Sequence, residues 1–283
     1  MTPSTQPLEA DWLGICRRAA EGLQGILRDS PTSAERILET GSVGEGGDRT
    51  LVIDQQAEDV VFAELERLHD DGVRFTAISE ERGSVDFGDP GLLVVIDPID
   101  GSLNAKRGLT HHALSIAVAD GPTMADVAFG YVFDLGPGEE WRAVRGGGAF
   151  LDDVALDPPP ERRTADGKLE LVAIESADPV WISRAAEPLC DVVHRVRAMG
   201  SIAISMCQVA ATRVDGMATL WKSRAVDAAA AQLIVRESGG HVSFPGMDQP
   251  LGAPLDLEPH SPVVAARTEQ GLRDLTTLPC WVR

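Results

Sequence analysis

Two aspartates, Asp97 and Asp100, flank a short turn in the sequence Asp-Pro-Ile-Asp-Gly-Ser that ends at Ser102. Pro98 holds Asp97 in an extended conformation and favours a turn, so the two carboxylates can converge on one point. Converging carboxylates suit a hard divalent cation, while Gly101 and Ser102 add backbone N–H groups and a hydroxyl that can hold phosphate oxygens. Taken alone, these residue types also suit an acidic surface turn. The segment therefore predicts a metal and phosphate site that other parts of the chain must complete.

Two predicted strands would bring acids to this site. The aliphatic run at residues 92–96 predicts a buried strand whose carboxyl end opens at Asp97. A second predicted strand, at residues 75–78, is followed after Ser79 by Glu80 and Glu81. Both strands would deliver carboxylates where a crevice is expected.

A third segment, the short apolar run 51–54, ends at an acid, Asp54, directly before a helix predicted over residues 55–69. Its structural alternative is a strand-end acid that caps this helix. The Gly-rich stretch at residues 39–50 predicts a mobile loop, and it is a candidate lid over the site. Glycine content by itself indicates only flexibility.

The remaining pattern predicts an α+β chain in two halves. Alternating apolar residues at 113–119 and 127–133 are typical of an antiparallel meander rather than a Rossmann-type crossover. The Pro-rich stretch 158–160 is the predicted boundary between two halves, residues 1–157 and residues 158–283. The first half carries most of the candidate metal ligands. The second half predicts strands at 169–174, 216–220 and 262–266, and helices at 201–211 and 228–237.

Composition limits the classes of partner. With 283 residues, 43% of them hydrophobic, the chain can bury a large core. A net charge of -19 argues against nucleic-acid binding, which depends on clustered Lys and Arg. Four widely spaced cysteines fit buried thiols better than a zinc site or a disulfide scaffold. The sequence shows no secretory pattern and no apolar run of membrane-spanning length, so a cytoplasmic protein without membrane partners is expected.

Four segments, in order, resemble the inositol monophosphatase and fructose-1,6-bisphosphatase superfamily, whose members are magnesium-dependent, lithium-sensitive phosphatases. The segments are residues 50–54 with Glu58, 79–81, 97–104, and 226–230 leading to 237–240. The resemblance extends over residues 10–270, and an acid stands at each expected place. Residues 97–108 and 129–132, and the pair Arg195 and Arg197 before Gly200 and Ser201, look most like the archaeal-type dual-specificity enzymes. The resemblance implies an α/β (α+β) layered α-β-α-β-α sandwich of the sugar-phosphatase type, and a homodimer.

The resemblance also implies the metal site. Its ligands would be Glu80, Asp97, Asp100 and Asp227, with the carbonyl oxygen of Ile99. Carboxylates from separate segments can share about two or three Mg²⁺ ions, because each ion takes about six oxygen ligands; Mn²⁺ can substitute. On its own, Asp227 also suits the N-cap of the Ala-rich helix that follows it.

Roles in catalysis are implied for two residues. In the family, the residues matching Asp54 and Ser102 assist the attacking water, and Ser102 stands where a threonine is usual. Serine keeps the hydroxyl group that threonine would supply. Our hypothesis is that Ser102, oriented by Asp54, accepts a hydrogen bond from the water and aligns it in line with the ester oxygen.

Substrate contacts are implied around the same turn and in the second half. The implied contacts are Gly101, Ser102, Arg195, Arg197, Gly200, Ser201 and Arg224. The arginines suit a second phosphate, although each suits a surface ion pair equally well in a chain with excess acids. Leu220 stands where animal inositol monophosphatases carry an acid that contacts inositol hydroxyls, which argues against a strict inositol enzyme.

The expected reaction is hydrolysis of a small phosphate ester, most of all inositol 1-phosphate, fructose 1,6-bisphosphate, or both. Alternative substrates are histidinol phosphate and adenosine 3′,5′-bisphosphate, which related enzymes cleave with the same metal machinery. A different interpretation is a non-catalytic sensor of metal or phosphosugar. The intact acids argue against it, since mutually repelling carboxylates are costly to keep without a function.

Overall fold

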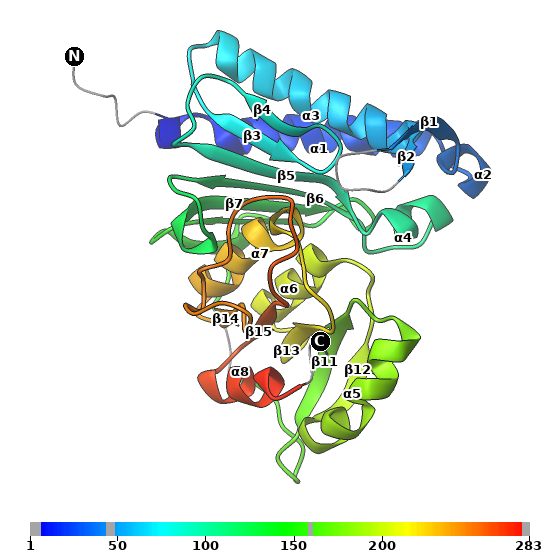
Figure 1. Cartoon of the computed structure of the whole chain (residues 1–283), viewed down its shortest axis with the longest axis vertical. Coiled ribbons are helices and arrows are strands. Elements are labelled where there is room, and N and C mark those ends of the chain that lie inside the picture. The colour runs from blue at the N-terminus through cyan, green and yellow to red at the C-terminus, as the bar shows by residue number, and fades with distance from the viewer. Residues whose placement is uncertain (1–6, 44–48, 158–160, 279–283) are drawn as a thin grey trace.

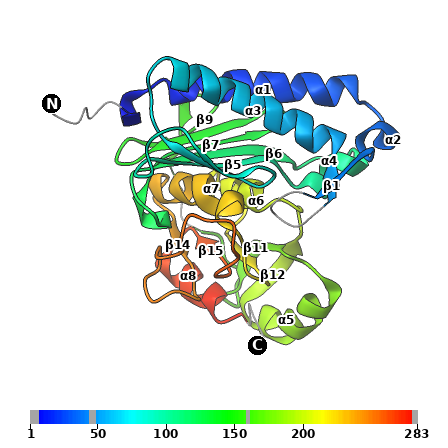
Figure 2. The ribbon, with the colours of Figure 1, turned by 45° about the horizontal axis from the view of Figure 1, so that its top comes forward.

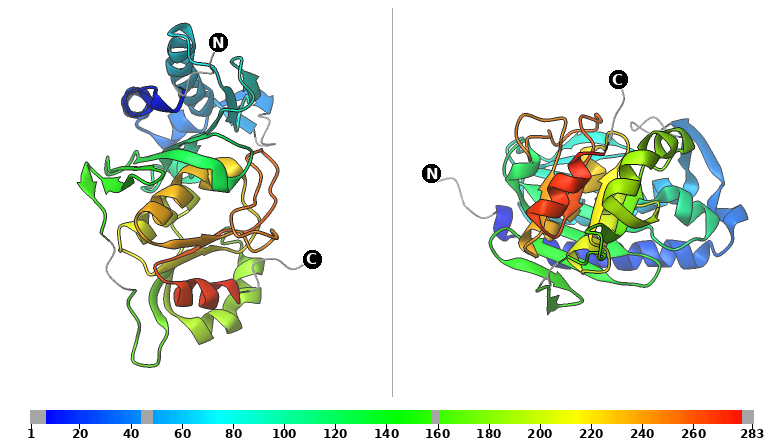
Figure 3. Two further views of the ribbon diagram at one scale, coloured as in Figure 1. Left: turned by 90° about the vertical axis from the view of Figure 1, so that its left-hand side faces the viewer. Right: turned by 90° about the horizontal axis from the view of Figure 1, so that it is seen from below.

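The structure is a computed structural model that describes residues 7–43, 49–157 and 161–278. Five layers follow one another along the long axis of the molecule (Figure 1). Two helices cover the outer face of an eight-stranded sheet, two lie between that sheet and a five-stranded sheet, and two cover the far face (Figure 3). In this order the three pairs are α1 (Trp12–Asp29) and α3 (Val52–Asp70), α6 (Ile202–Ala210) and α7 (Ala225–Glu237), and α5 (Pro179–Val192) and α8 (Glu269–Thr276). The predicted α-β-α-β-α sandwich is confirmed.

The eight-stranded sheet has the order β10-β9-β8-β7-β6-β5-β3-β4. Its strands are β3 (Thr76–Ser79), β4 (Gly83–Asp86), β5 (Leu93–Asp100), β6 (Ala113–Ala119), β7 (Val127–Asp134), β8 (Glu140–Val144), β9 (Gly148–Leu151) and β10 (Val154–Ala155). Strands β6 and β7 form the antiparallel pair that was predicted, and β5, β8 and β9 extend it into a longer meander. Strand β3 instead runs parallel to β5 and pairs Ser79 with Ile96. Glu80, the first residue after β3, and Asp97, which still pairs within β5, therefore lie side by side.

The five-stranded sheet has the order β12-β11-β13-β15-β14. Its strands are β11 (Leu169–Glu175), β12 (Val193–Arg197), β13 (Gly216–Thr219), β14 (His241–Ser243) and β15 (Val264–Ala266). Strand β11 is parallel to both β12 and β13, and it pairs Glu175 with Thr219. The carboxyl ends of these strands share one sheet edge.

Helix α7 is buried on every side because it lies between the two sheets (Figure 2). Its run of alanines lets it approach the eight-stranded sheet closely: a Cβ at Gly130 of β7 would lie only 2.6 Å from the Ala230 carbonyl oxygen. Such a site excludes larger side chains. The same packing fixes Asp227, in the first turn of α7, against the end of β5.

Two expectations in the N-terminal region were wrong. Residues predicted as a loop include β1 (Glu39–Val43) and β2 (Arg49–Leu51), which pair as a short antiparallel hairpin. Residues 44–48 of that predicted loop lie outside the described residues. Asp54 does not end a strand, because α3 already begins at Val52 and places Asp54 in its first turn. A carboxylate is favoured there by the helix dipole.

The first sheet uses residues up to Ala155 and the second begins at Leu169, whereas the predicted boundary at 158–160 lies outside the described residues. The two halves share one core, in which Val95 of β5 and Ala229 of α7 belong to the same apolar cluster. The described residues also contain two short α-helices, α2 (Ser33–Arg36) and α4 (Ser102–Arg107), and two 3-10 helices, η1 (Pro7–Glu9) and η2 (Met124–Asp126). Among the described residues, no helix has the length and apolar character needed to cross a membrane.

Candidate metal and phosphate site

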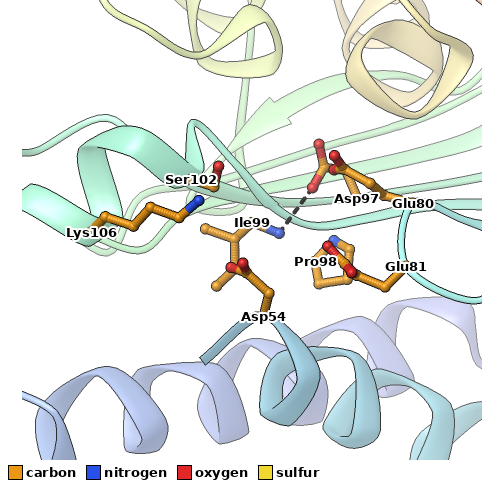
Figure 4. Close-up of a pocket in the computed structure, with 8 residues that line it drawn as sticks. All are labelled: Asp54, Glu80, Glu81, Asp97, Pro98, Ile99, Ser102 and Lys106. Atoms are coloured by element: carbon orange, nitrogen blue, oxygen red, sulfur yellow. Dashed lines mark hydrogen bonds between the residues drawn. The ribbon is translucent and has the colours of Figure 1, made fainter. Parts of the chain in front are cut away.

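Four segments deliver side chains to one pocket beside the carboxyl end of β5 (Figure 4). Asp54 comes from the first turn of α3, Glu80 and Glu81 follow β3, and Asp97 ends the aliphatic run of β5. Ser102, at the first position of α4, closes the pocket. Both residues proposed for catalysis, Asp54 and Ser102, therefore line the same pocket as two of the predicted metal ligands.

Three carboxylates come closest together. Asp97, Asp100 and Asp227 each offer an oxygen, and these atoms lie within 4.8 Å of one another. All three residues are buried. Glu80 lies outside this group of three, yet it is near enough for its charge to raise the pKa of Asp97. Three of the four predicted ligand side chains therefore meet at one place, as ion sharing requires, and the fourth, Glu80, lies nearby.

Local hydrogen bonds fix two of these carboxylates. The predicted turn at Pro98 is instead the last part of β5, whose pairing with β6 is irregular between Asp97 and Asp100. Here the Ile99 N–H donates to Asp97 Oδ1 at 2.9 Å. Asp100 Oδ2 accepts from Ser201 Oγ at 2.5 Å and from the Ala203 N–H at 2.7 Å. These donors hold the carboxylates in one orientation, as bonds to metal ligands commonly do.

Charge repulsion in this cluster is strong. Burial raises the pKa of Asp97 well above its ordinary value, and the charges of Glu80 and Asp100 raise it further. Burial, together with the charge of Asp227, raises the pKa of Asp100 to about 7, although hydrogen bonds from Ser201 and Ala203 oppose the rise. A bound divalent cation would remove this repulsion. The donor set, made of carboxylate oxygens, therefore fits a hard ion such as Mg²⁺.

The metal-free protein is expected to lose stability as pH rises from about 4 to about 7. In this window folded Asp100 keeps a proton that the unfolded chain has released, so the free energy of unfolding falls as pH rises. Thermal unfolding of chelator-treated protein at several pH values measures this. Mg²⁺ should reduce the loss, and Asp100→Asn should flatten the pH dependence. If Asp100→Asn showed the same pH dependence of stability as wild type, Asp100 would not be its cause.

Arg224 lies against the predicted metal ligands. Its Nη1 donates to Glu80 Oε1 at 2.7 Å and its Nη2 to Asp227 Oδ1 at 3.1 Å. The Asp227 and Glu80 charges raise the pKa of Arg224 despite its burial. The sequence predicted a substrate contact here, and the structure adds an ion pair with two acids of the cluster. A single guanidinium thus neutralises part of the charge that a metal ion would neutralise.

Arg224→Gln is expected to destabilise the metal-free protein by about 3 kcal/mol, because it leaves buried carboxylates without their cation. The rise in melting temperature on adding Mg²⁺ should be larger than in wild type, since the ion no longer competes with a guanidinium. Thermal unfolding with and without Mg²⁺ measures both effects. Exposed Lys222→Gln, two residues away, is the matched control. Equal Mg²⁺ responses in Arg224→Gln and Lys222→Gln would show that Arg224 does not compete with the ion.

The predicted sugar-contacting loop, at Gly200 and Ser201, packs directly on the segment from Asp97 to Ser102, called the metal turn below. Gly101, the N-cap of α4, has φ 84°, and a Cβ there would lie 2.8 Å from the His111 carbonyl oxygen and 3.0 Å from that of Gly200. Ser201 donates to Asp100, as described above. Gly200 also lines a cavity of about 420 Å³ with Asp100 and Asp227. Gly101, Gly200 and Ser201 are therefore brought together at the site.

Two predicted contacts lie elsewhere. Arg195 and Arg197 are exposed on β12, an edge strand, and their Nη1 groups donate to the carbonyl oxygens of His194 and Val196. Neither lines the two cavities that the carboxylates line. Conversely, Lys106 lines the acidic pocket from the turn of α4 that follows Ser102 (Figure 4). Its spacing of four from Ser102 placed both on one helix face, which was the available sequence signal.

Fold and site together define a layered sandwich of the sugar-phosphatase type with a buried cluster of carboxylates. The family model described as "Inositol monophosphatase family" matches residues 13–277, and the chain belongs to this family. A fructose-1,6-bisphosphatase/inositol-1-monophosphatase of Methanothermobacter thermautotrophicus is 32% identical over 82% of this chain and 84% of its own length. A Nus factor SuhB of Pasteurella multocida is 33% identical over 81% of this chain and 84% of its own length.

Solved structures agree on the fold. A crystal structure described as an inositol monophosphatase-fructose 1,6 bisphosphatase has a TM-score of 0.79. It covers 94% of this chain and 98% of its own, at 22% sequence identity. Mycobacterium tuberculosis SuhB has a TM-score of 0.67 at 23% identity, covering 92% of this chain and 90% of its own. At these identities the likeness concerns the fold.

Proposed function

We propose that this protein hydrolyses small phosphomonoesters with Mg²⁺, and that its substrates are inositol 1-phosphate, fructose 1,6-bisphosphate, or both. The observation that carries the proposal is the meeting of Asp97, Asp100 and Asp227 within 4.8 Å, next to the pocket lined by Asp54 and Ser102. Membership in the inositol monophosphatase family supports it, as does the relative named for both activities.

The proposed ligands are Glu80, Asp97, Asp100, Asp227 and the carbonyl oxygen of Ile99. When bound, Mg²⁺ supplies Lewis-acid polarisation of phosphoryl oxygens and a lowered pKa of the attacking water. Mn²⁺ is the expected substitute.

The chain's own residues would orient the reactants. Asp54 would accept a hydrogen bond from the Ser102 hydroxyl and so orient it, and the Ser102 oxygen would accept a hydrogen bond from the attacking water and set its line of approach. Backbone N–H groups at the start of α4, behind Gly101, can hold the phosphate oxygens. Arg224, at the cavity wall, supplies a further donor once a cation takes its place on Glu80 and Asp227.

The cavity beside Asp100 and Asp227 suits the organic part of a small ester. It holds about 420 Å³, and its walls include Ser176, Ala177 and Met199. This is within the range of sites for small ligands. Arg195 and Arg197 line neither cavity, so a contact with a second phosphate stays a prediction for both.

Phosphate release from a panel of four esters tests the proposal. The panel is inositol 1-phosphate, fructose 1,6-bisphosphate, histidinol phosphate and adenosine 3′,5′-bisphosphate, each with Mg²⁺ and with chelator. We expect Mg²⁺-dependent release from one or both of the first two. Appreciable release from histidinol phosphate or the nucleotide alone would overturn the substrate assignment. No release from any ester, with Mg²⁺ bound, would favour the non-catalytic alternative.

Further properties are proposed on the same basis. We expect a cytoplasmic homodimer that acts on small molecules without nucleic-acid or membrane partners. The net charge of -19 supports the absence of nucleic acid. Light scattering of the purified protein measures the oligomeric state.

A further inference from the structure

Glu175 is a buried acid at the carboxyl end of β11 that lies outside the implied ligand set, and only 3% of it is exposed. Its Oε1 accepts from the Met199 N–H at 2.8 Å and from Ser205 Oγ at 2.6 Å. Its Oε2 accepts from the Gly200 N–H at 2.9 Å. One carboxylate therefore binds two consecutive backbone amides and one hydroxyl.

Those two amides belong to the loop that contacts the metal turn. The same loop continues into Ser201, whose hydroxyl donates to Asp100 Oδ2. From the other side, Asn104 Nδ2 donates to the Met199 carbonyl oxygen at 2.7 Å. Met199 and Gly200 also line the cavity beside Asp100. The loop is thus at once a wall of the cavity and a support for a predicted metal ligand.

The loop has little room to shift without moving its neighbours. A Cβ at Gly200 would lie 2.8 Å from Asn104 Nδ2, and one at Gly101 would lie 3.0 Å from the Gly200 carbonyl oxygen. The loop is thus in direct contact with the Asn104 side chain on one side and with the Gly101 backbone on the other. A displacement of the Met199–Gly200 peptide would therefore be transmitted to Asp100 and the cavity wall.

The hydrogen bonds of Glu175 are of the strong kind. Burial raises its pKa, while Ser205, Met199 and Gly200 lower it by donating to the ionised carboxylate. A hydrogen bond to a charged group is stronger than one between neutral groups. Glutamine has one acceptor oxygen in place of two and would set an NH₂ group against a backbone N–H. Aspartate keeps the charge, but it is one methylene too short to reach both amides.

We propose that Glu175 is a positioning residue that fixes the Met199–Gly200 loop, and through Ser201 the orientation of Asp100, so that substrate affinity and metal affinity depend on one carboxylate. The predicted effect on substrate affinity rests on the proposed phosphatase function. The predicted effect on metal affinity depends only on the acidic cluster.

The test compares Glu175→Gln, Glu175→Asp and Ser205→Ala with wild type. Mg²⁺ dissociation constants come from calorimetry on metal-stripped protein, and KM and kcat from phosphate release. Both Glu175 variants should weaken Mg²⁺ binding and raise KM about tenfold, the scale found when a support of a metal ligand is lost. Ser205→Ala removes one donor of three and should produce a smaller change in the same direction. Glu170→Gln, at an exposed position of the same strand, is the matched control and should match wild type.

The variants separate positioning from charge. If Glu175→Asp keeps wild-type Mg²⁺ affinity and KM while Glu175→Gln loses them, only the negative charge matters and the proposal fails. The proposal also fails if all three variants lower the melting temperature without changing the Mg²⁺ dissociation constant or KM. Should Glu175→Gln not fold, Glu175→Asp and Ser205→Ala still decide. If wild type cleaves no ester, the proposed function fails, whereas the calorimetry still tests Glu175.

Discussion

Asp97→Asn is expected to lower phosphate release by about a thousandfold or more, because stabilisation by the bound ions is worth several kcal/mol in the transition state. Asp97 is central to the cluster: it is 2% exposed, and the charges of Glu80, Asp100 and Asp227 all raise its pKa. An amide keeps the shape but removes the charge that attracts the ion. The measurement is the initial rate of phosphate release at saturating Mg²⁺, alongside calorimetry of Mg²⁺ binding.

The control for this variant is Asp191→Asn, which neutralises an exposed aspartate away from the cluster. It should keep wild-type activity and Mg²⁺ affinity. Since Asp97→Asn also relieves repulsion among buried carboxylates, the metal-free variant should be at least as stable as wild type. Retention of both Mg²⁺ affinity and turnover by folded Asp97→Asn would exclude Asp97 as a ligand.

Asp54→Asn is expected to reduce kcat by about 10²–10⁴-fold, the range that positioned proton acceptors contribute. Asp54 lines the acidic pocket with Ser102 but is not among the three carboxylates that lie within 4.8 Å of one another. Its loss should therefore affect turnover far more than Mg²⁺ affinity. Kinetics at saturating substrate and calorimetry of Mg²⁺ binding separate the two effects.

Asp70→Asn, at the exposed end of the same helix, controls for a change of charge on α3. It should leave kcat unchanged. The catalytic role would be wrong if Asp54→Asn kept wild-type turnover. A loss of Mg²⁺ binding equal to that of Asp97→Asn would instead make Asp54 a ligand.

The acid-bearing strand ends could be predicted because their signals are local. An aliphatic run that stops at Asp97 indicates a buried strand, and a second run stops just before Glu80. Their adjacency follows from the parallel pairing of β3 with β5, which aligns Ser79 with Ile96. Neither run alone predicts that pairing, because an apolar run carries no information on which strand lies beside it. The resemblance to the family implied only that Glu80 and Asp97 share a metal site, and the pairing itself was not predicted.

Two elements without a clear apolar pattern, β12 and α5, were not predicted from the sequence. Strand β12 is buried at Val193 and exposed at its other four residues, so it lacks the alternation of a half-buried strand. Helix α5 carries Pro188 inside it, a residue that normally argues against a helix. Both elements depend on pairing or packing with neighbouring strands rather than on their own sequences.

Side-chain partners were the hardest part of the site to predict. The ion pair of Arg224 with Glu80 joins residues 144 positions apart, and the bonds of Glu175 reach Met199 and Gly200 across a strand and a helix. Sequence spacing carries no information on such contacts. The residue types were noticed at Arg224, but its electrostatic partners came from the tertiary fold.

The most direct test of the central claim is anomalous diffraction from crystals of this protein soaked in Mn²⁺. The account predicts strong anomalous peaks among the carboxylates of Asp97, Asp100 and Asp227, with Glu80 turned from Arg224 toward an ion. A well-ordered, Mn²⁺-saturated crystal without a peak among these carboxylates would contradict it.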